Sequence, residues 1–136
     1  VVADAAHNPH GAQATADALR EYFPGRLVGV VGMMADKDVE GFLGVLEPVL
    51  DAVVVTDIAS DRAMDADELA DIAGGVFGDG RVFVERNLAE AIDRAAGLAE
   101  SDDGAPMASP AVVVLGSIQL VAAARTLMGK PGADGA

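Results

Sequence analysis

Near its amino end the chain carries a short polar run whose residue types suit ligand binding, DAAHNPH at residues 4–10. The run follows two valines typical of a strand and leads directly into a helical pattern. Asn8 can cap that helix through its side-chain oxygen, and Pro9 suits the first helical position, where a backbone N–H would be unpaired anyway. A helix start after a strand is a natural place for a phosphate or carboxylate. Asp4 and His7 stand just before it, so the run favours binding of a hydroxyl group or an anion.

Three other groups of polar or glycine residues follow apolar runs of strand length. The charged run DKD at residues 36–38 comes after the second apolar run, Thr56 and Asp57 end the third, and Gly116 and Ser117 end the last. In a parallel sheet the carboxyl ends of all strands lie along one edge, and ligands bind outside that edge. The placement therefore predicts one shared site at the carboxyl edge of a sheet.

Each of these residues also has a purely structural interpretation. Asp4 can cap a turn or hold His7, and His7 can be a structural histidine with satisfied hydrogen bonds. Asn8 and Ser117 can be helix N-caps, and Asp38 can cap the helix that follows the charged run. At Ser117 a cap and a ligand contact are compatible, because the hydroxyl and the amides of the helix start can hold an anion together. The residues alone leave both interpretations open.

Apolar runs of strand length alternate with helical patterns along the whole chain. The predicted strands span residues 1–3, 27–31, 52–56, 81–84 and 111–115. The predicted helices span residues 9–22, 39–46, 87–99 and 118–128, and one more begins at the capping box Asp65-x-x-Glu68, a pattern that Asn87-x-x-Glu90 repeats. The helical period places Ala12, Thr15, Ala16 and Leu19 on one face of the first helix and turns Phe42, Leu43 and Leu46 inward in the second. Continuous apolar strands separated by helices indicate a parallel sheet covered on both faces. We therefore expect an α/β fold, a three-layer Rossmann-like domain with a mostly parallel sheet of five or six strands and helices on both faces.

Taken together, the motifs resemble the C-terminal domain of the dihydrofolate synthase/folylpolyglutamate synthase family, which is related to the Mur ligases. The likeness rests on DAAHNPH at residues 4–10, GMMADKD at residues 32–38 and GS at residues 116–117, in that order and after matching strands. It implies a Mur-ligase-type C-terminal domain over residues 1–129 and a disordered tail over residues 130–136. The chain begins within a strand, without an initiator Met and without a P-loop, so we expect a fragment of a longer enzyme whose N-terminal ATPase domain is absent.

The resemblance implies an ATP-dependent acid–amino-acid ligase. In such enzymes ATP phosphorylates the carboxyl group of dihydropteroate or of a folate glutamate tail, and the amine of L-glutamate then displaces the phosphate to form an amide. Asp4 and Asn8 would contact the nucleotide, Asp4 at the ribose. His7 and Ser117 would be catalytic and would bind substrate, while Lys37 would bind the substrate's carboxylate or the transferred phosphoryl group. Mg²⁺ would be bound by the missing N-terminal domain, which is the expected partner, and this fragment alone would be inactive.

One residue and two alternative functions stay open at this point. Arg62 stands in a context that resembles the family's Pro-Arg-Ala turn, but Asp61 replaces the usual proline, which leaves its role undecided. A Mur-type peptide ligase is the nearer alternative, although a Lys would be expected there near the position of His7. A receiver-like signalling module also gathers acidic residues and a Thr or Ser at the carboxyl edge, but this chain lacks the Lys expected at the end of its last strand.

Composition excludes several classes of function. With 22 acidic and 9 basic residues the formal net charge is -13, which argues against nucleic acid or an anionic membrane as a partner. An anionic ligand must then be attracted by local amides, Lys or Arg rather than by the overall field. The absence of cysteine excludes disulfides and thiolate sites, and a turn with two nearby histidines makes no dedicated metal site. No apolar run reaches the roughly 18–20 residues of a membrane span. We expect a cytoplasmic monomer.

Overall fold

Five strands form a single parallel sheet among the residues that the structure describes. The structure is a computed structural model, and it describes residues 2–3, 9–22, 26–35, 37–58, 61–100 and 111–116. The strands are β1 (Val2–Ala3), β2 (Leu27–Gly32), β3 (Ala52–Val55), β4 (Val82–Val84) and β5 (Ala111–Gly116). The helices are α1 (Pro9–Tyr22), α2 (Val39–Leu46), α3 (Ala66–Phe77) and α4 (Leu88–Glu100), with a short 3₁₀ turn η1 (Asp79–Arg81). The strand order is β1-β5-β2-β3-β4 and every pairing is parallel, which confirms the expected α/β class.

The central strands are buried on both faces because helices cover both sides of the sheet. Alternate residues of a strand point to opposite faces, so β2 sends Leu27 and Val31 to one core and Val28 and Val30 to the other. All six residues of β2 are buried. This double burial explains why the strands appear in the sequence as continuous valine-rich runs rather than as an alternation of apolar and polar residues.

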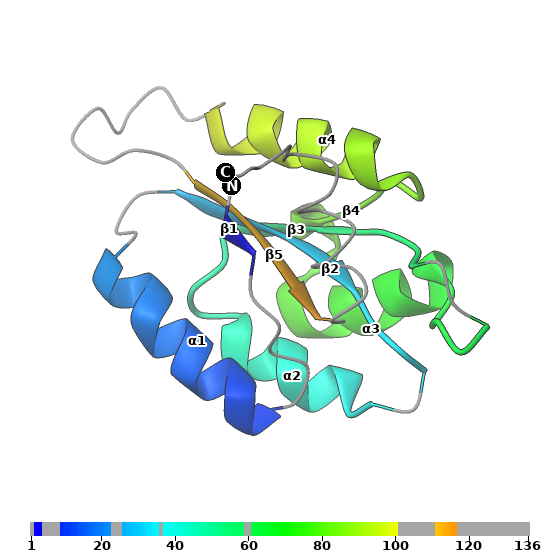
Figure 1. The fold of residues 1–136 in the computed structure, drawn as a ribbon, viewed down its shortest axis with the longest axis horizontal. Helices are drawn as coiled ribbons and strands as arrows, with labels where there is room; N and C mark the ends of the chain where they lie inside the picture. Colours follow the sequence, from blue (N-terminus) through cyan, green and yellow to red (C-terminus); the bar gives the residue numbers. More distant parts are fainter. Residues whose placement is uncertain are drawn as a thin grey trace, which may run out of the picture.

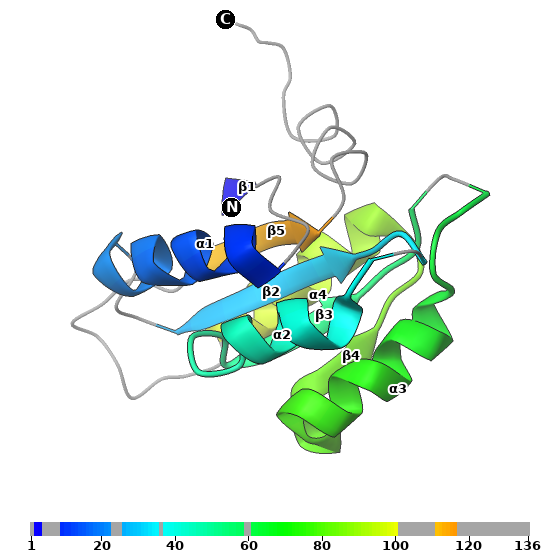
Figure 2. The same cartoon turned by 90° about the horizontal axis from the view of Figure 1, so that it is seen from below.

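The helices divide unequally between the two faces. Figures 1 and 2 show α1, α2 and α3 on one side of the sheet and α4 on the other, which confirms the three-layer arrangement. The residues that the helical period placed inside α1 and α2 are all buried: Ala12, Thr15, Ala16, Leu19, Phe42, Leu43 and Leu46. The α4 residues that are buried against the second face are all small, namely Ala91, Ala95 and Ala99, so this helix can approach the strands closely, and the larger Leu88, Ile92 and Leu98 pack partly buried around them. No described helix has the length and apolar composition needed to cross a membrane.

Side-chain caps fix the start of three helices. Asp38 accepts from the Gly41 amide (3.1 Å), Asp65 from the Asp67 amide (2.9 Å) and Asn87 from the Glu90 amide (3.1 Å). Each bond satisfies an amide that has no partner within its own helix. The capping patterns in the sequence therefore located these helix starts correctly.

The expected strand over residues 81–84 begins one residue later in the structure, because Arg81 belongs to η1. Its amide donates to the Gly78 carbonyl (3.1 Å), and its guanidinium lies over the Phe77 ring. The same guanidinium donates to the carbonyl oxygens of Glu47 (3.0 Å) and Leu50 (2.6 Å), just after α2 ends. These bonds satisfy backbone carbonyls of the turn that follows α2, so Arg81 works as a turn residue rather than a strand residue. The predicted helix over 118–128 and the tail over 130–136 lie outside the described residues.

The carboxyl ends of β2 and β5 meet at a pair of glycines, Gly32 and Gly116, which are partners in the sheet register. Gly116 has φ +115°, a conformation that residues with a Cβ rarely adopt. A Cβ at this position would collide with the Gly32 carbonyl oxygen and approach the Met33 sulfur to 2.9 Å. Two separate constraints, backbone conformation and space, therefore require glycine at the end of β5.

We expect Gly116→Ala to lower the free energy of unfolding by about 2–4 kcal/mol, from the unfavourable φ and the collision together. Urea denaturation of the purified chain would measure it. Gly97→Ala is the matched control, since Gly97 lies within α4 and a Cβ there would meet no neighbouring atom within 4 Å. The control should be neutral or gain about 0.5–1 kcal/mol. Equal urea midpoints for Gly116→Ala and the unchanged chain would contradict the assignment.

Candidate functional site

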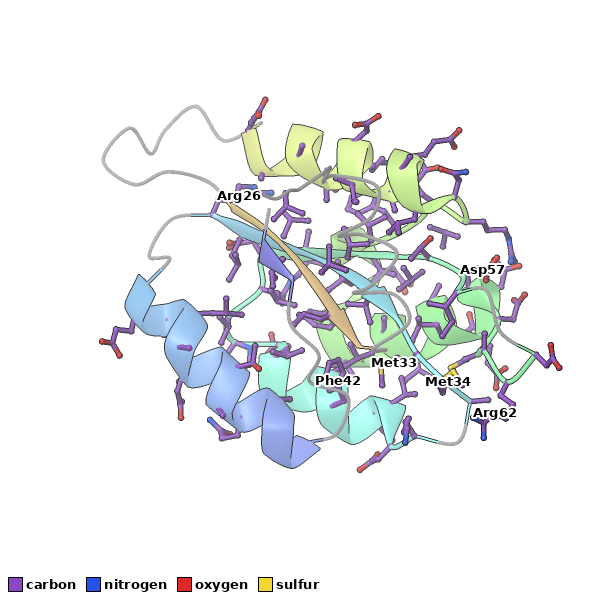
Figure 3. All side chains as sticks on the ribbon, viewed as in Figure 1. Arg26, Met33, Met34, Phe42, Asp57 and Arg62 are labelled. Carbon is purple, nitrogen blue, oxygen red and sulfur yellow. The ribbon has the colours of Figure 1, made fainter. Side chains whose placement is uncertain are left out.

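Two connections at the carboxyl edge pair with each other through their backbones. The segment after β2, residues 33–35, forms an antiparallel bridge to the segment before α3 at Met34 and Ala63. The Ala35 amide donates to the Arg62 carbonyl (2.8 Å), and the Met64 amide donates to the Met33 carbonyl (2.9 Å). Figure 3 shows Met34 and Arg62 together beyond the end of β2, at the opposite side of the sheet from Arg26.

This pairing places two cationic residues on the same part of the edge. Arg62 is exposed and lies on one of the paired segments, while Lys37 is exposed two residues beyond the other. The Lys37 amide donates to the Met34 carbonyl (3.3 Å) and its carbonyl accepts from the Val39 amide (2.9 Å), so the backbone at Lys37 is fixed between β2 and α2. The exposed Lys37 is therefore a local positive charge at this part of the edge, in a chain whose net charge of -13 offers an anionic ligand no general attraction.

The other end of the edge, beyond β3 and β4, is closed by the protein's own groups. The Glu85 amide donates to the Val55 carbonyl (3.0 Å), and the hydroxyl of Thr56, which is fully buried, donates to the Arg86 carbonyl (3.0 Å). Asp57 accepts from the Ala66 amide at the start of α3 (3.0 Å). Thr56 and Asp57 therefore satisfy backbone groups, and their polar atoms are structural.

Arg86 draws three carboxylates together at the start of α3. Its guanidinium contacts Asp57 at 2.9 Å, Asp65 at 3.1 Å and Asp67 at 2.8 Å. The Arg86 hydrogen bond, with the capping amide of Asp67, holds the pKa of Asp65 below its ordinary value. Asp57 and Asp65 occupy the amides of Ala66 and Asp67, so the start of α3 is not open to an anionic ligand.

Sequence reasoning did not identify Arg86 as part of this edge. The signal was available: Arg86 follows a short apolar run closely, as the other edge residues do, and three acidic residues surround the predicted start of α3. What the sequence lacked was the order of the strands, which places β4 beside β3.

The predicted site residues fall into two groups. Lys37 is at the carboxyl edge as expected, and Asp38 is the cap of α2 that its structural interpretation required. Asp4, His7, Asn8 and Ser117 lie outside the described residues, as does Asp36. The described residues nearest to them, Ala3 at the end of β1 and Gly116 at the end of β5, lie on neighbouring strands that end at this same edge. Their predicted roles stay predictions. Within the described ranges no group of three or more His, Cys, Asp or Glu residues is arranged to hold a metal ion.

Comparison with known proteins agrees with this architecture. Residues 1–118 match the protein family described as Mur ligase, glutamate ligase domain. The chain is 45% identical over 137 residues to the dihydrofolate synthase/folylpolyglutamate synthase of Mycobacterium tuberculosis, an alignment that covers 96% of this chain and 28% of that protein. A crystal structure of the folylpolyglutamate synthase of Mycobacterium tuberculosis complexed with ADP and AMPPCP superposes with a TM-score of 0.88 at 46% identity, over 94% of this chain and 29% of that one.

A relative with a different substrate also matches. The UDP-N-acetylmuramoyl-L-alanyl-D-glutamate–2,6-diaminopimelate ligase 1 of Clostridium acetobutylicum is 35% identical over 106 residues, which is 76% of this chain and 22% of that protein. The chain spans less than a third of the length of each of these proteins. The matches therefore concern one domain of larger ligases.

The Arg86 cluster makes stability depend on pH in a defined direction. The pKa of Asp65 is lowered from 3.8 in the folded state, so its stabilising effect is present above pH 3.8 and is lost as the pH falls through the lower folded-state value. We expect Asp65→Asn, which keeps an oxygen for the helix cap, to melt below the unchanged chain at pH 6, and the difference to narrow progressively once the pH falls below about 4.

Thermal unfolding followed by circular dichroism between pH 3 and pH 7 would measure the difference. Asp93→Asn, on the exposed side of α4 and outside the cluster, is the control and should show no such convergence. A constant gap between Asp65→Asn and the unchanged chain at every pH would rule out this source of stability.

Proposed function

The chain belongs to the Mur ligase, glutamate ligase domain family, and from that premise we propose that it is the C-terminal domain of an ATP-dependent folylpolyglutamate/dihydrofolate synthase. The observation that carries the proposal is the joint agreement in sequence and fold with the Mycobacterium tuberculosis folylpolyglutamate synthase, at 46% identity and a TM-score of 0.88. The complete protein is proposed to act as a cytoplasmic monomer that adds L-glutamate to dihydropteroate, to folates or to both.

The proposed reaction joins a carboxyl group to an amine. ATP, with Mg²⁺ held by an N-terminal ATPase domain, supplies the phosphoryl group that activates the carboxyl carbon of the dihydropteroate or folate. The amine of L-glutamate attacks that carbon, the C–N bond forms, the C–O bond to phosphate breaks, and the amine gives up a proton. The products are the amide, ADP and phosphate. A site that excludes water favours the amine over hydrolysis.

The residues of this chain would orient the reactants at the carboxyl edge. In this proposal Asp4 accepts hydrogen bonds from the ribose and Asn8 lies beside the nucleotide. His7, just before α1 in the sequence, and Ser117, just before the predicted helix over 118–128, hold the transferred phosphate or the glutamate carboxylate. Lys37 contributes a point charge to the same anion. The position of the exposed Lys37 at the carboxyl edge supports this assignment, because the strongly acidic chain offers an anion no general attraction.

A Mur-type peptide ligase is the second candidate, favoured by the match to the Clostridium acetobutylicum enzyme. Both candidates activate a carboxyl group and add an amine, so the fold does not distinguish them. They differ in the acceptor, which a direct comparison of substrates resolves.

We expect the complete protein to release ADP only when L-glutamate and a dihydropteroate or folate acceptor are both present. The chain of residues 1–136 alone should show no turnover, since it has no phosphate-binding loop. It should bind ATP with a dissociation constant weaker than about 10 μM. Coupled ADP release and calorimetry provide the two measurements. Turnover with a UDP-muramoyl peptide in place of the folate would select the second candidate, and turnover by the isolated chain would overturn the division of roles between the domains.

In the complete protein Asp4→Ala should mainly raise the KM for ATP. The loss of a charge-assisted hydrogen bond to the ribose corresponds to about 1.5–3 kcal/mol, or roughly 10- to 150-fold. His7→Ala and Ser117→Ala should lower kcat and kcat/KM for ligation together if their contacts form in the transition state. Lys37→Met should raise the KM for glutamate.

Steady-state kinetics with ATP and glutamate varied separately would distinguish these effects, and melting temperatures would identify any variant that only loses a helix cap. An unchanged KM for ATP and an unchanged kcat in Asp4→Ala would refute the ribose contact. Normal turnover in folded His7→Ala and Ser117→Ala would remove both residues from the site.

A further inference from the structure

We propose that Arg86 is a positioning residue for the Lys37 end of the site, although it lies at the other end of the same edge. It anchors the segment 61–65, and that segment is paired with the connection that leads from β2 to Lys37. The inference deepens the proposed function and rests on it for its kinetic consequence, but its structural part can be tested without any activity.

The first step is that Arg86 itself is rigidly held. Its backbone carbonyl accepts from the buried Thr56 hydroxyl (3.0 Å), and the preceding amide, of Glu85, donates to the Val55 carbonyl (3.0 Å). Its backbone is therefore attached to the end of β3, a strand whose four residues are all buried. A guanidinium on such a base presents its donors in a fixed plane.

The second step is that this guanidinium fixes the entry to α3. It contacts both oxygens of Asp65, at 3.1 and 3.4 Å, and it contacts Asp57 and Asp67 at 2.9 and 2.8 Å. A single exposed ion pair contributes little. Here, however, three carboxylates converge on one cation, and removing it would leave them to repel each other. The repulsion would act on Asp65, the residue that directly follows the paired segment.

The third step connects Asp65 to Lys37. Next to Asp65, the Met64 amide donates to the Met33 carbonyl (2.9 Å), and the Ala35 amide donates to the Arg62 carbonyl (2.8 Å). The side chains of Met33 and Met64 are 1% and 6% exposed, so the pair is fixed to the core on one side. A shift of Asp65 therefore reaches Ala35, two residues before Lys37, through a continuous set of backbone hydrogen bonds.

Hydrogen exchange of the chain of residues 1–136 tests the structural part. In Arg86→Met we expect the amides of Met64 and Ala35 to exchange roughly 5- to 30-fold faster than in the unchanged chain. Arg94→Met is the control: it removes the same positive charge, but from α4, where Arg94 has a single ion pair (Glu85, 2.7 Å) and an aromatic contact (Phe83) instead of three carboxylates. Unchanged exchange at both amides in Arg86→Met, or equal acceleration in Arg94→Met, would overturn the proposal.

Kinetics of the complete protein test the functional part. Arg86→Met should raise the KM for glutamate by roughly 3- to 30-fold while the KM for ATP stays within about 2-fold, because in this proposal the displaced Lys37 serves the glutamate carboxylate and the ribose contact of ATP belongs to Asp4. Arg86→Lys keeps the positive charge but lacks the planar guanidinium, so its KM for glutamate should lie between those of Arg86→Met and the unchanged protein. It serves in place of Arg86→Met if that variant does not fold.

The outcomes separate the two proposals. If the complete protein without any substitution had no ligase activity, the proposed function would be refuted, and the hydrogen-exchange result for Arg86→Met would still stand. An active unchanged protein whose Arg86 variants show a normal KM for glutamate, or equal rises for glutamate and ATP, would refute the positioning role alone.

Discussion

The structure depends above all on one constraint: every strand of the sheet runs in the same direction. All four pairings are parallel, so each strand must be followed by a connection that returns to the opposite edge. The helices in these connections cover the two faces of the sheet. Because the strands are parallel, all their carboxyl ends lie along one edge. Polar residues that are dispersed over the whole sequence are thereby collected on one side of a core made almost entirely of aliphatic side chains.

The two edges of the sheet use arginine for different purposes. At the amino edge Arg81 donates to the carbonyl oxygens of Glu47, Leu50 and Asp51, and an ion pair to Glu47 (2.9 Å) completes the set. These carbonyls lie in the connection between α2 and β3, and the bonds from Arg81 satisfy them. At the carboxyl edge Arg86 instead gathers side-chain acids. In both places a planar guanidinium satisfies several acceptors at once, which a lysine cannot do with the same geometry.

The carboxyl edge is consequently divided into a closed end and an open end. Beyond β3 and β4 the helix amides and the cation are occupied by Asp57, Asp65 and Asp67, so that end contributes rigidity. Beyond β2 the exposed Arg62 lies on the segment that pairs with residues 33–35, and the exposed Lys37 lies two residues past that pairing. For a domain with net charge -13, this division matters because attraction of an anion depends on a few fixed cations rather than on the total field.

The sequence by itself determined the elements, the helix caps, the buried faces and the family. Strand and helix periods, the caps at Asp65 and Asn87, and the inward residues of α1 and α2 are local properties, readable within a few neighbouring residues. The sequence also predicted that the polar residues gather at one edge, because the carboxyl ends of parallel strands always lie on the same edge of a sheet. The tertiary structure alone decided that Arg86 meets the acids of α3, that the segments 33–35 and 61–64 pair, and that Arg81 leaves β4 to bond the end of α2. Each of these contacts joins residues about twenty to thirty-five positions apart, and they depend on strand order and side-chain reach, which no local pattern encodes.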